Sequence, residues 1–162
     1  MSKRTAYPNL LNKLKMHNRI LQIKRFHRDA KLPTRATLGS GGLDLYACED
    51  AVIGAGATCE FPLGFALYIE DPTLAGLIVP RSGLATKHGI VLANTVGLID
   101  SDYQGELVAY LWNRSDNNYT VKKGDRIAQL VLIPIIEPKI EWFYVKEFNK
   151  SGRGTGGFGS TG

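Results

Sequence analysis

Residues 94–106 read Asn94-Thr-Val-Gly-Leu-Ile-Asp-Ser-Asp-Tyr-Gln-Gly-Glu106, an apolar run followed directly by two carboxylates. Gly97 can take the positive φ of a tight turn, so we predict that residues 94–99 form a β-hairpin. Backbone N–H and C=O groups at a hairpin tip can bind a flat polar ligand such as a nucleobase. Asp100, at the exit, can act on a water molecule, and Tyr103 offers a ring face with a polar tip. The alternative interpretation is a plain hairpin with solvated aspartates and a half-buried tyrosine.

Short strand-like segments recur along the rest of the chain at intervals of roughly 8–12 residues, with turn residues between them. They lie at 21–26, 43–47, 58–61, 63–70, 76–79, 106–112, 126–133 and 140–145. Residues 82–87 predict one turn of helix with Ser82 as its N-cap. This spacing is typical of a sandwich or barrel, so we expect an all-β chain.

Size and composition describe an ordinary globular protein. The chain has 162 residues, enough for one well-cored domain, and is 44% hydrophobic and 22% charged. No apolar run approaches the roughly 20 residues of a membrane helix, and we expect no membrane partner. Cys48 and Cys59 lack CxxC spacing and paired histidines, which favours buried thiols in a reducing compartment over disulfides or a zinc site. We therefore expect a cytoplasmic protein.

The positive charge is concentrated at the front of the chain. The net charge is +5, yet residues 1–28 hold eight Lys and Arg and no acid, so the remainder is net acidic. We expect residues 1–18 to be a flexible basic extension; the alternatives are an organelle- or nucleus-targeting segment and a nucleic-acid tether. Residues 19–148 form the expected β domain. Residues 149–162 are Gly-rich, either a disordered tail or an arm that closes over a nucleotide.

Five segments together resemble, in order, the motifs of the trimeric dUTP diphosphatases (dUTPases). They are Gly42-Leu-Asp-Leu-Tyr-Ala47, Pro80-Arg-Ser-Gly-Leu-Ala85, Val96-Gly-Leu-Ile-Asp-Ser-Asp-Tyr-Gln-Gly-Glu106, Gly124-Asp-Arg-Ile-Ala-Gln-Leu130 and Arg153-Gly-Thr-Gly-Gly-Phe-Gly-Ser-Thr-Gly162. The resemblance covers about residues 20–162 and departs only at Gly41, where alanine is commoner. It implies a jelly-roll-like β-barrel or sandwich with a short helix after the second motif and a flexible C-terminal arm. It also implies a homotrimer whose active sites are shared between subunits.

The resemblance implies hydrolysis of dUTP to dUMP and diphosphate, which removes dUTP and supplies dUMP for dTTP synthesis. Asp100 matches the family's general base, which activates a water for attack at the α-phosphorus. Tyr103 matches the tyrosine that packs against the deoxyribose and leaves no room for a 2′-hydroxyl. Asn94, with the backbone groups of Gly97 and Ile99, matches the residues that bind uracil.

Further matches concern the phosphates and the metal. Asp44 matches an aspartate that holds Mg²⁺ indirectly, through metal-bound water. In the C-terminal arm, Phe158 matches a ring that stacks over uracil. The other residues matching substrate contacts are Arg81, Ser82, Gly83, Gln129, Arg153, Gly159, Ser160 and Thr161.

Two other functions fit parts of the pattern. One is a dCTP deaminase of the same fold superfamily. Three features argue against a deaminase: Tyr103, the setting of Asp100 and the full glycine arm. The other is a regulatory module with the dUTPase fold that contacts nucleic acid through residues 1–18.

Overall fold

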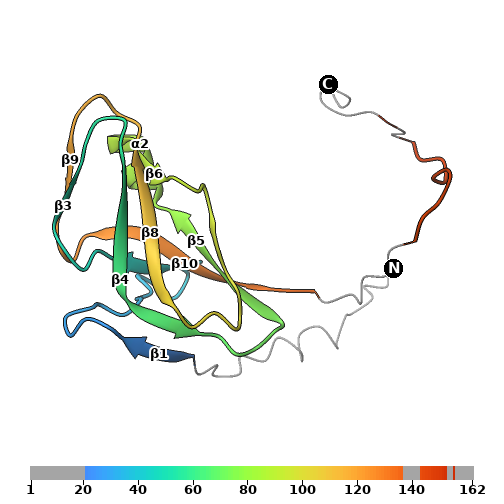
Figure 1. The fold of residues 1–162 in the computed structure, drawn as a ribbon, viewed down its shortest axis with the longest axis horizontal. Helices are drawn as coiled ribbons and strands as arrows, with labels where there is room; N and C mark the ends of the chain where they lie inside the picture. The colour runs from blue at the N-terminus through green and yellow to red at the C-terminus, as the bar shows by residue number, and fades with distance from the viewer. Residues whose placement is uncertain (1–20, 137–142, 153–154, 156–162) are drawn as a thin grey trace, which may run out of the picture.

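Two four-stranded antiparallel sheets and a two-stranded ribbon make up most of the structure, a computed structural model that describes residues 21–136, 143–152 and 155 (Figure 1). The first sheet has the order β1 (Gln22–Arg25), β4 (Thr58–Tyr68), β8 (Glu106–Asn113), β6 (Ile90–Leu92). The second has the order β2 (Leu43–Tyr46), β10 (Arg126–Pro134), β5 (Leu74–Pro80), β7 (Gly97–Ile99). The ribbon pairs β3 (Ala51–Ile53) with β9 (Tyr119–Val121), and a short helix, α2 (Ser82–His88), follows β5. The prediction of an all-β sandwich with a helix after the second motif is confirmed.

The core lies where the inner faces of the sheets meet. Successive side chains of a strand point to opposite faces, and β8 shows this alternation along its length. Its inward residues are Leu107, Ala109 and Leu111, each at most 1% exposed, whereas its outward residues are about 40% exposed. β4 pairs with β8 and contributes the buried rings of Phe61 and Phe65. The two strands run side by side in Figure 1.

One long strand, β4, replaces the two strands predicted at 58–61 and 63–70. The pairing with β8 shifts between Pro62 and Ala66, which marks a bulge. Gly64 lies in it with φ of 76°, and a Cβ there would stand 2.7 Å from that of Ala30. The Gly64 N–H donates to Glu106 Oε1 at 2.8 Å. The bulge therefore bends the strand without ending it.

Two local predictions are wrong. Residues 94–99 do not form a hairpin, because β6 before them pairs with β8 while β7 pairs with β5 in the other sheet. The positive φ in this crossing is at Thr95, at 63°, and not at Gly97. Helix α2 is capped by Arg81, which makes no side-chain capping bond, and Ser82 is its first helical residue.

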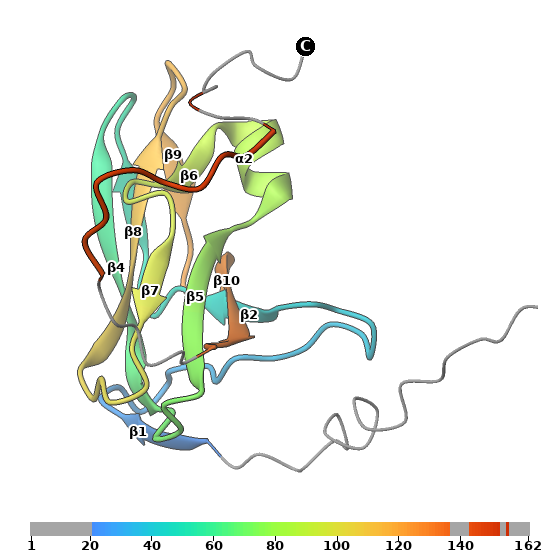
Figure 2. The ribbon, with the colours of Figure 1, turned by 90° about the vertical axis from the view of Figure 1, so that its right-hand side faces the viewer.

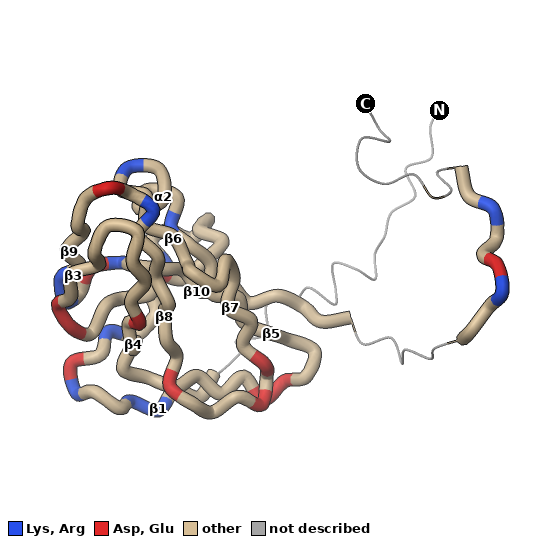
Figure 3. Tube along the Cα trace, turned by 45° about the horizontal axis from the view of Figure 1, so that its top comes forward, with Lys and Arg blue, Asp and Glu red and all other residues tan. Residues whose placement is uncertain are grey.

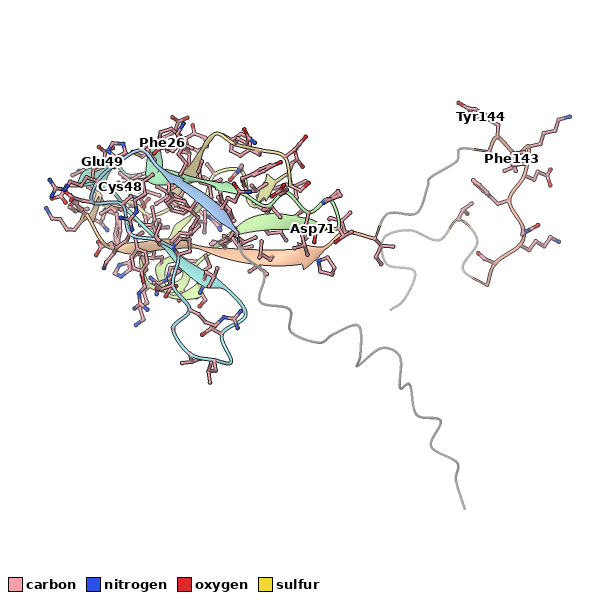
Figure 4. The ribbon with its side chains drawn as sticks, turned by 90° about the horizontal axis from the view of Figure 1, so that it is seen from below. Phe26, Cys48, Glu49, Asp71, Phe143 and Tyr144 are labelled. Carbon is pink, nitrogen blue, oxygen red and sulfur yellow. The ribbon has the colours of Figure 1, made fainter. Side chains whose placement is uncertain are left out.

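The predicted strand at 140–145 lies partly outside the described residues. The described part, residues 143–145, forms no strand. Phe143 and Tyr144 are 87% and 98% exposed, and Figure 4 shows both side chains away from the sheets. The three-residue strands β3, β6 and β9 were not predicted.

Basic and acidic residues are interspersed along one edge of the described β region. In Figure 3, Lys and Arg positions alternate with Asp and Glu positions along the edge that carries β1, β3 and β9. The basic extension, residues 1–18, lies outside the described residues. None of the helices in the described part of the chain is long and apolar enough to span a membrane.

Candidate active site

A buried carboxylate on β2 brings three of the five motifs together. The Asp44 side chain is only 4% exposed, and strand pairing sets it opposite Gln129 on β10. Gln129 Nε2 donates to Asp44 Oδ1 at 3.3 Å, and Arg126 Nη1 donates to Oδ2 at 3.2 Å. Arg81 Nε lies 3.7 Å from Oδ1. The two guanidinium groups compensate a charge that burial alone would disfavour.

Arg81 reaches this carboxylate because it stands where β5 ends and α2 begins. Its Nη1 also donates to the Arg126 carbonyl at 2.8 Å, which fixes the direction of the side chain. Ser82 and Gly83 follow on the exposed first turn of α2, and nothing lies within 4 Å of a Cβ built at Gly83. The surface at Gly83, two residues from Arg81, is therefore open.

A second group of predicted residues lines a pocket of about 300 Å³ between β7 and β8. All five residues predicted for the base, sugar and attacking water take part: Asn94, Gly97, Ile99, Asp100 and Tyr103. The rest of the lining is mostly apolar, formed by Ile78, Leu98, Glu106, Leu107 and Val108. An apolar pocket with a few polar groups at its edge suits a small planar ligand.

The loop after β7 holds Asp100 and Tyr103 in a defined relation. The Tyr103 N–H donates to the Asp100 carbonyl at 3.2 Å, and the Tyr103 hydroxyl donates to the Glu106 carbonyl at 3.1 Å. Asp100 itself is exposed, so its carboxylate is open to water. Tyr103, the predicted sugar gate, and Asp100, the predicted general base, thus lie in one turn that hydrogen bonds hold in place.

The two groups lie apart within one chain. Asp44 lies on β2 and the Asp100 turn follows β7, and two strands, β10 and β5, lie between β2 and β7 in the sheet (Figure 2). At about 4.8 Å per strand, the lateral separation is about 14 Å. Through the pairing of the strands, Asp44 stands at the position of Val79 on β5, and Ile99 stands opposite Gly76 on the same strand, three residues away. At about 3.3 Å per residue, this adds about 10 Å along the strands.

Other predicted residues fall outside the described part of the chain: Arg153, Phe158, Gly159, Ser160 and Thr161. Glu106 was not predicted as a site residue. It lines the pocket, accepts from Tyr103 through its carbonyl and holds the β4 bulge through its carboxylate. No sequence pattern indicated this role, because Gly64 lies 42 positions away.

Within the described residues, no group of three or more His, Cys, Asp and Glu side chains is arranged to hold a metal ion. Mg²⁺ usually keeps several waters and needs only one or two carboxylates alongside substrate phosphates. A single carboxylate such as Asp44, already bonded to Arg126 and Gln129, fits an ion held through water and phosphate.

Comparison with known proteins places these motifs in context. The dUTPase family model matches residues 28–162. A deoxyuridine 5'-triphosphate nucleotidohydrolase of Pseudomonas aeruginosa is 54% identical over 140 residues, covering 85% of this chain and 91% of that protein.

Solved structures agree with the sequence comparison. A mutant dUTPase of Staphylococcus bacteriophage 80alpha, solved with dUpNHpp, superposes with a TM-score of 0.79 at 30% identity, covering 88% of this chain and 98% of that one. A mutant dUTPase of phage phi11 of S. aureus, in which a structural Mg(II) ion is coordinated, is 25% identical with a TM-score of 0.71, covering 80% and 98%.

Proposed function

This chain belongs to the dUTPase family and hydrolyses dUTP, and from that premise we propose that Asp100 is the general base of the reaction. The observation that carries the proposal is the pocket between β7 and β8, where Asp100 stands exposed beside Asn94 and Tyr103. Its carboxylate orients and deprotonates a water that attacks the α-phosphorus, giving dUMP and diphosphate. A positioned general base typically contributes about 10²–10⁴-fold to the rate.

The same pocket selects the substrate. The Asn94 amide can both donate and accept a hydrogen bond, which suits the uracil edge, and the Gly97 and Ile99 backbone completes the contact. Tyr103 packs its ring against the deoxyribose and excludes a 2′-hydroxyl by volume. A cytosine amino group would leave donors facing donors in a partly desolvated pocket, which is costly.

The Asp44 group binds the phosphates. Arg81 offers a guanidinium fork to phosphate oxygens, and Ser82 and Gly83 lie beside it. Gln129 stands near the phosphates and the attacking water. Asp44 would hold Mg²⁺ through metal-bound water, and the ion would offset the charge of the triphosphate and fix its shape. Asp44 also orients Arg81 and Gln129 from beneath.

We further propose that the enzyme is a homotrimer whose active sites are shared between subunits. The support is the separation of Asp44 from Ile99, the residue before Asp100. The offset of about 14 Å across the strands and the offset of about 10 Å along them combine to roughly 17 Å in one chain. Direct contacts from both carboxylates to one phosphate group would not span that distance. Asp44 of one protomer and Asp100 of another would meet around each dUTP.

The C-terminal arm, residues 149–162, would complete a neighbour's site. Phe158 would stack over uracil, and Arg153, Gly159, Ser160 and Thr161 would contact the substrate at the γ-phosphate end. Phe143 and Tyr144, which precede the arm, are exposed and do not pack on the sheets of their own chain. The free thiols Cys48 and Cys59 support the cytoplasm as the site of action.

Isotope labelling tests the direction of attack and the base together. Hydrolysis in ¹⁸O-water is expected to place the label in dUMP; label in diphosphate would refute attack at the α-phosphorus. Asp100→Asn is expected to keep dUTP binding and lower kcat by at least about 100-fold. Asp102→Asn, two residues along in the same loop, is the matched control, and an Asp100→Asn enzyme with the wild-type kcat would remove the base assignment.

A further inference from the structure

We propose that Gly105 determines sugar specificity by leaving the space in which the Tyr103 ring lies. The inference rests on the proposed role of Tyr103 as the gate against a 2′-hydroxyl. It concerns a residue that contacts the gate and not the substrate, so Gly105 is a positioning residue.

The Tyr103 ring folds back over the α-carbon of Gly105. A Cβ built at Gly105 would stand 2.6 Å from Cζ and 3.0 Å from Cε2 of the ring, and closer still to the hydroxyl oxygen. Ordinary van der Waals contact begins at about 3.4 Å. Any side chain at position 105 would therefore overlap the ring in its present place.

Backbone conformation does not explain this glycine. The described glycines with positive φ are Gly56, Gly64, Gly89 and Gly124, so the backbone at position 105 is one that alanine can adopt. The requirement at this position is space for a ring. That separates Gly105 from Gly64, where both the φ angle and close neighbours exclude a side chain.

Two hydrogen bonds hold Tyr103 at this place, one made by its backbone and one made by its ring. The Tyr103 N–H donates to the Asp100 carbonyl, and the hydroxyl donates to the Glu106 carbonyl. The Tyr103 residue is nevertheless 42% exposed, so the protein does not enclose its outer side. A ring displaced by a side chain at position 105 would move outward, away from Gly105 and toward the proposed sugar site, and its hydroxyl bond to the Glu106 carbonyl would be lost.

The displacement of the Tyr103 ring that Gly105→Ala requires is small, but its expected effect on the reaction rate is large. Moving Cζ from 2.6 Å to an ordinary contact requires a shift of roughly 1 Å. A misplacement of about 1 Å can cost about 100-fold in an enzyme's rate. The shift acts on dUTP, for which the ring is positioned, more than on UTP, which the ring already rejects.

The test measures kcat/KM for dUTP and UTP in four enzymes: wild type, Gly105→Ala, Tyr103→Ala and the double variant. We expect Gly105→Ala to lower the dUTP:UTP ratio of kcat/KM by about tenfold or more. Gly39→Ala is the matched control, because a Cβ at Gly39 meets nothing within 4 Å, and it is expected to keep the wild-type ratio.

The double variant shows whether the effect runs through the ring. Without a ring there is no overlap, so Gly105→Ala should change the ratio less than twofold when Tyr103 is already alanine. A wild-type ratio in Gly105→Ala, or an effect that adds in full to that of Tyr103→Ala, would overturn the inference alone. An unchanged ratio in Tyr103→Ala would overturn the gate itself and the inference with it.

Folding is followed by thermal unfolding of the same enzymes. If Gly105→Ala does not fold, the double variant is still expected to fold, because the ring that would clash is absent. A double variant that is also unfolded would contradict the proposed cause.

Discussion

Replacing Asp44 with asparagine tests the polar group that joins the first, second and fourth motifs. The carboxylate has two acceptor oxygens, one bonded to Arg126 and one to Gln129. Asparagine keeps the shape but has one acceptor oxygen and an NH₂ group. In either orientation a donor would face a donor at one of the two contacts, and both nearby guanidinium groups would lose their counter-charge.

The size of the effect follows from burial. A hydrogen bond to a charged group contributes about 1.5–3 kcal/mol when it is sheltered from water. The Asp44 side chain is 4% exposed, but that of Arg126 is 49% exposed and that of Arg81 is 24% exposed, so water replaces part of what is lost. We expect Asp44→Asn to lower the free energy of unfolding by about 2 kcal/mol. For a chain of this size that lowers Tm by roughly 4–8 °C.

The assay is differential scanning calorimetry of wild type and variant at the same protein concentration, since assembly raises Tm by mass action. Asp29→Asn is the matched control. Its carboxylate, 68% exposed, pairs with Lys123 at the surface, and such pairs contribute at most about 1 kcal/mol. Equal Tm values for Asp44→Asn and the wild type would refute the stabilising role assigned to this carboxylate.

Three further changes have defined outcomes. Asn113→Ala is expected to lower the free energy of unfolding by about 3 kcal/mol in urea titration. The reason is that the fully buried amide donates to the Ile53 and Asn117 carbonyls and accepts from the Ser115 N–H and hydroxyl. A loss below about 1 kcal/mol would contradict this expectation. Hydrogen bonds from the Lys123 N–H and then from the Lys122 ammonium lower the pKa of Asp50 from its usual 3.8. The contribution of Asp50 to folding stability is therefore present above that pH and is lost as the pH falls. The stability advantage of wild type over Asp50→Asn, measured by urea midpoints, should therefore shrink in acid, and an advantage that grows would reverse the sign assigned here. Deleting residues 153–162 should reduce turnover while Tm stays within about 2 °C, and a truncated enzyme with full activity would exclude the closing arm.

Periodicity predicted the long strands because packing and pattern agree there. β8 alternates along its whole length, and residues 106–112 carry that signal in the sequence. β10 likewise follows the apolar run at 126–133. The three-residue strands β3, β6 and β9 are too short to show a period, so their pairing could be found only in three dimensions.

The error at 94–99 has a different cause. A glycine between apolar residues is a sound local sign of a hairpin. Which strand pairs with which depends on partners far away in the sequence, here Asn113 for Ile90 and Gly76 for Ile99. The chain crosses from one sheet to the other, and Thr95, which is not a typical residue for positive φ, makes the turn.

The motifs named the candidate site residues but did not show how these residues are arranged. Asp44 and Gln129 are 85 positions apart, and only the register of β2 on β10 shows that their side chains meet. The order of the motifs gives no sign that Asp44 and Asp100 stand on opposite sides of β5. That separation is the feature on which the proposal of shared sites depends.

The sharing of sites is tested most directly by mixing two variants that are each expected to lose activity, Asp100→Asn and Arg81→Ala. Each chain keeps the group that the other lacks, so a site built from one chain of each kind can be complete. Random assembly from equal amounts is expected to restore about a quarter of the wild-type activity in closed rings of like contacts. A mixture, unfolded and refolded together, that is no more active than either variant alone would show that each chain builds its site by itself.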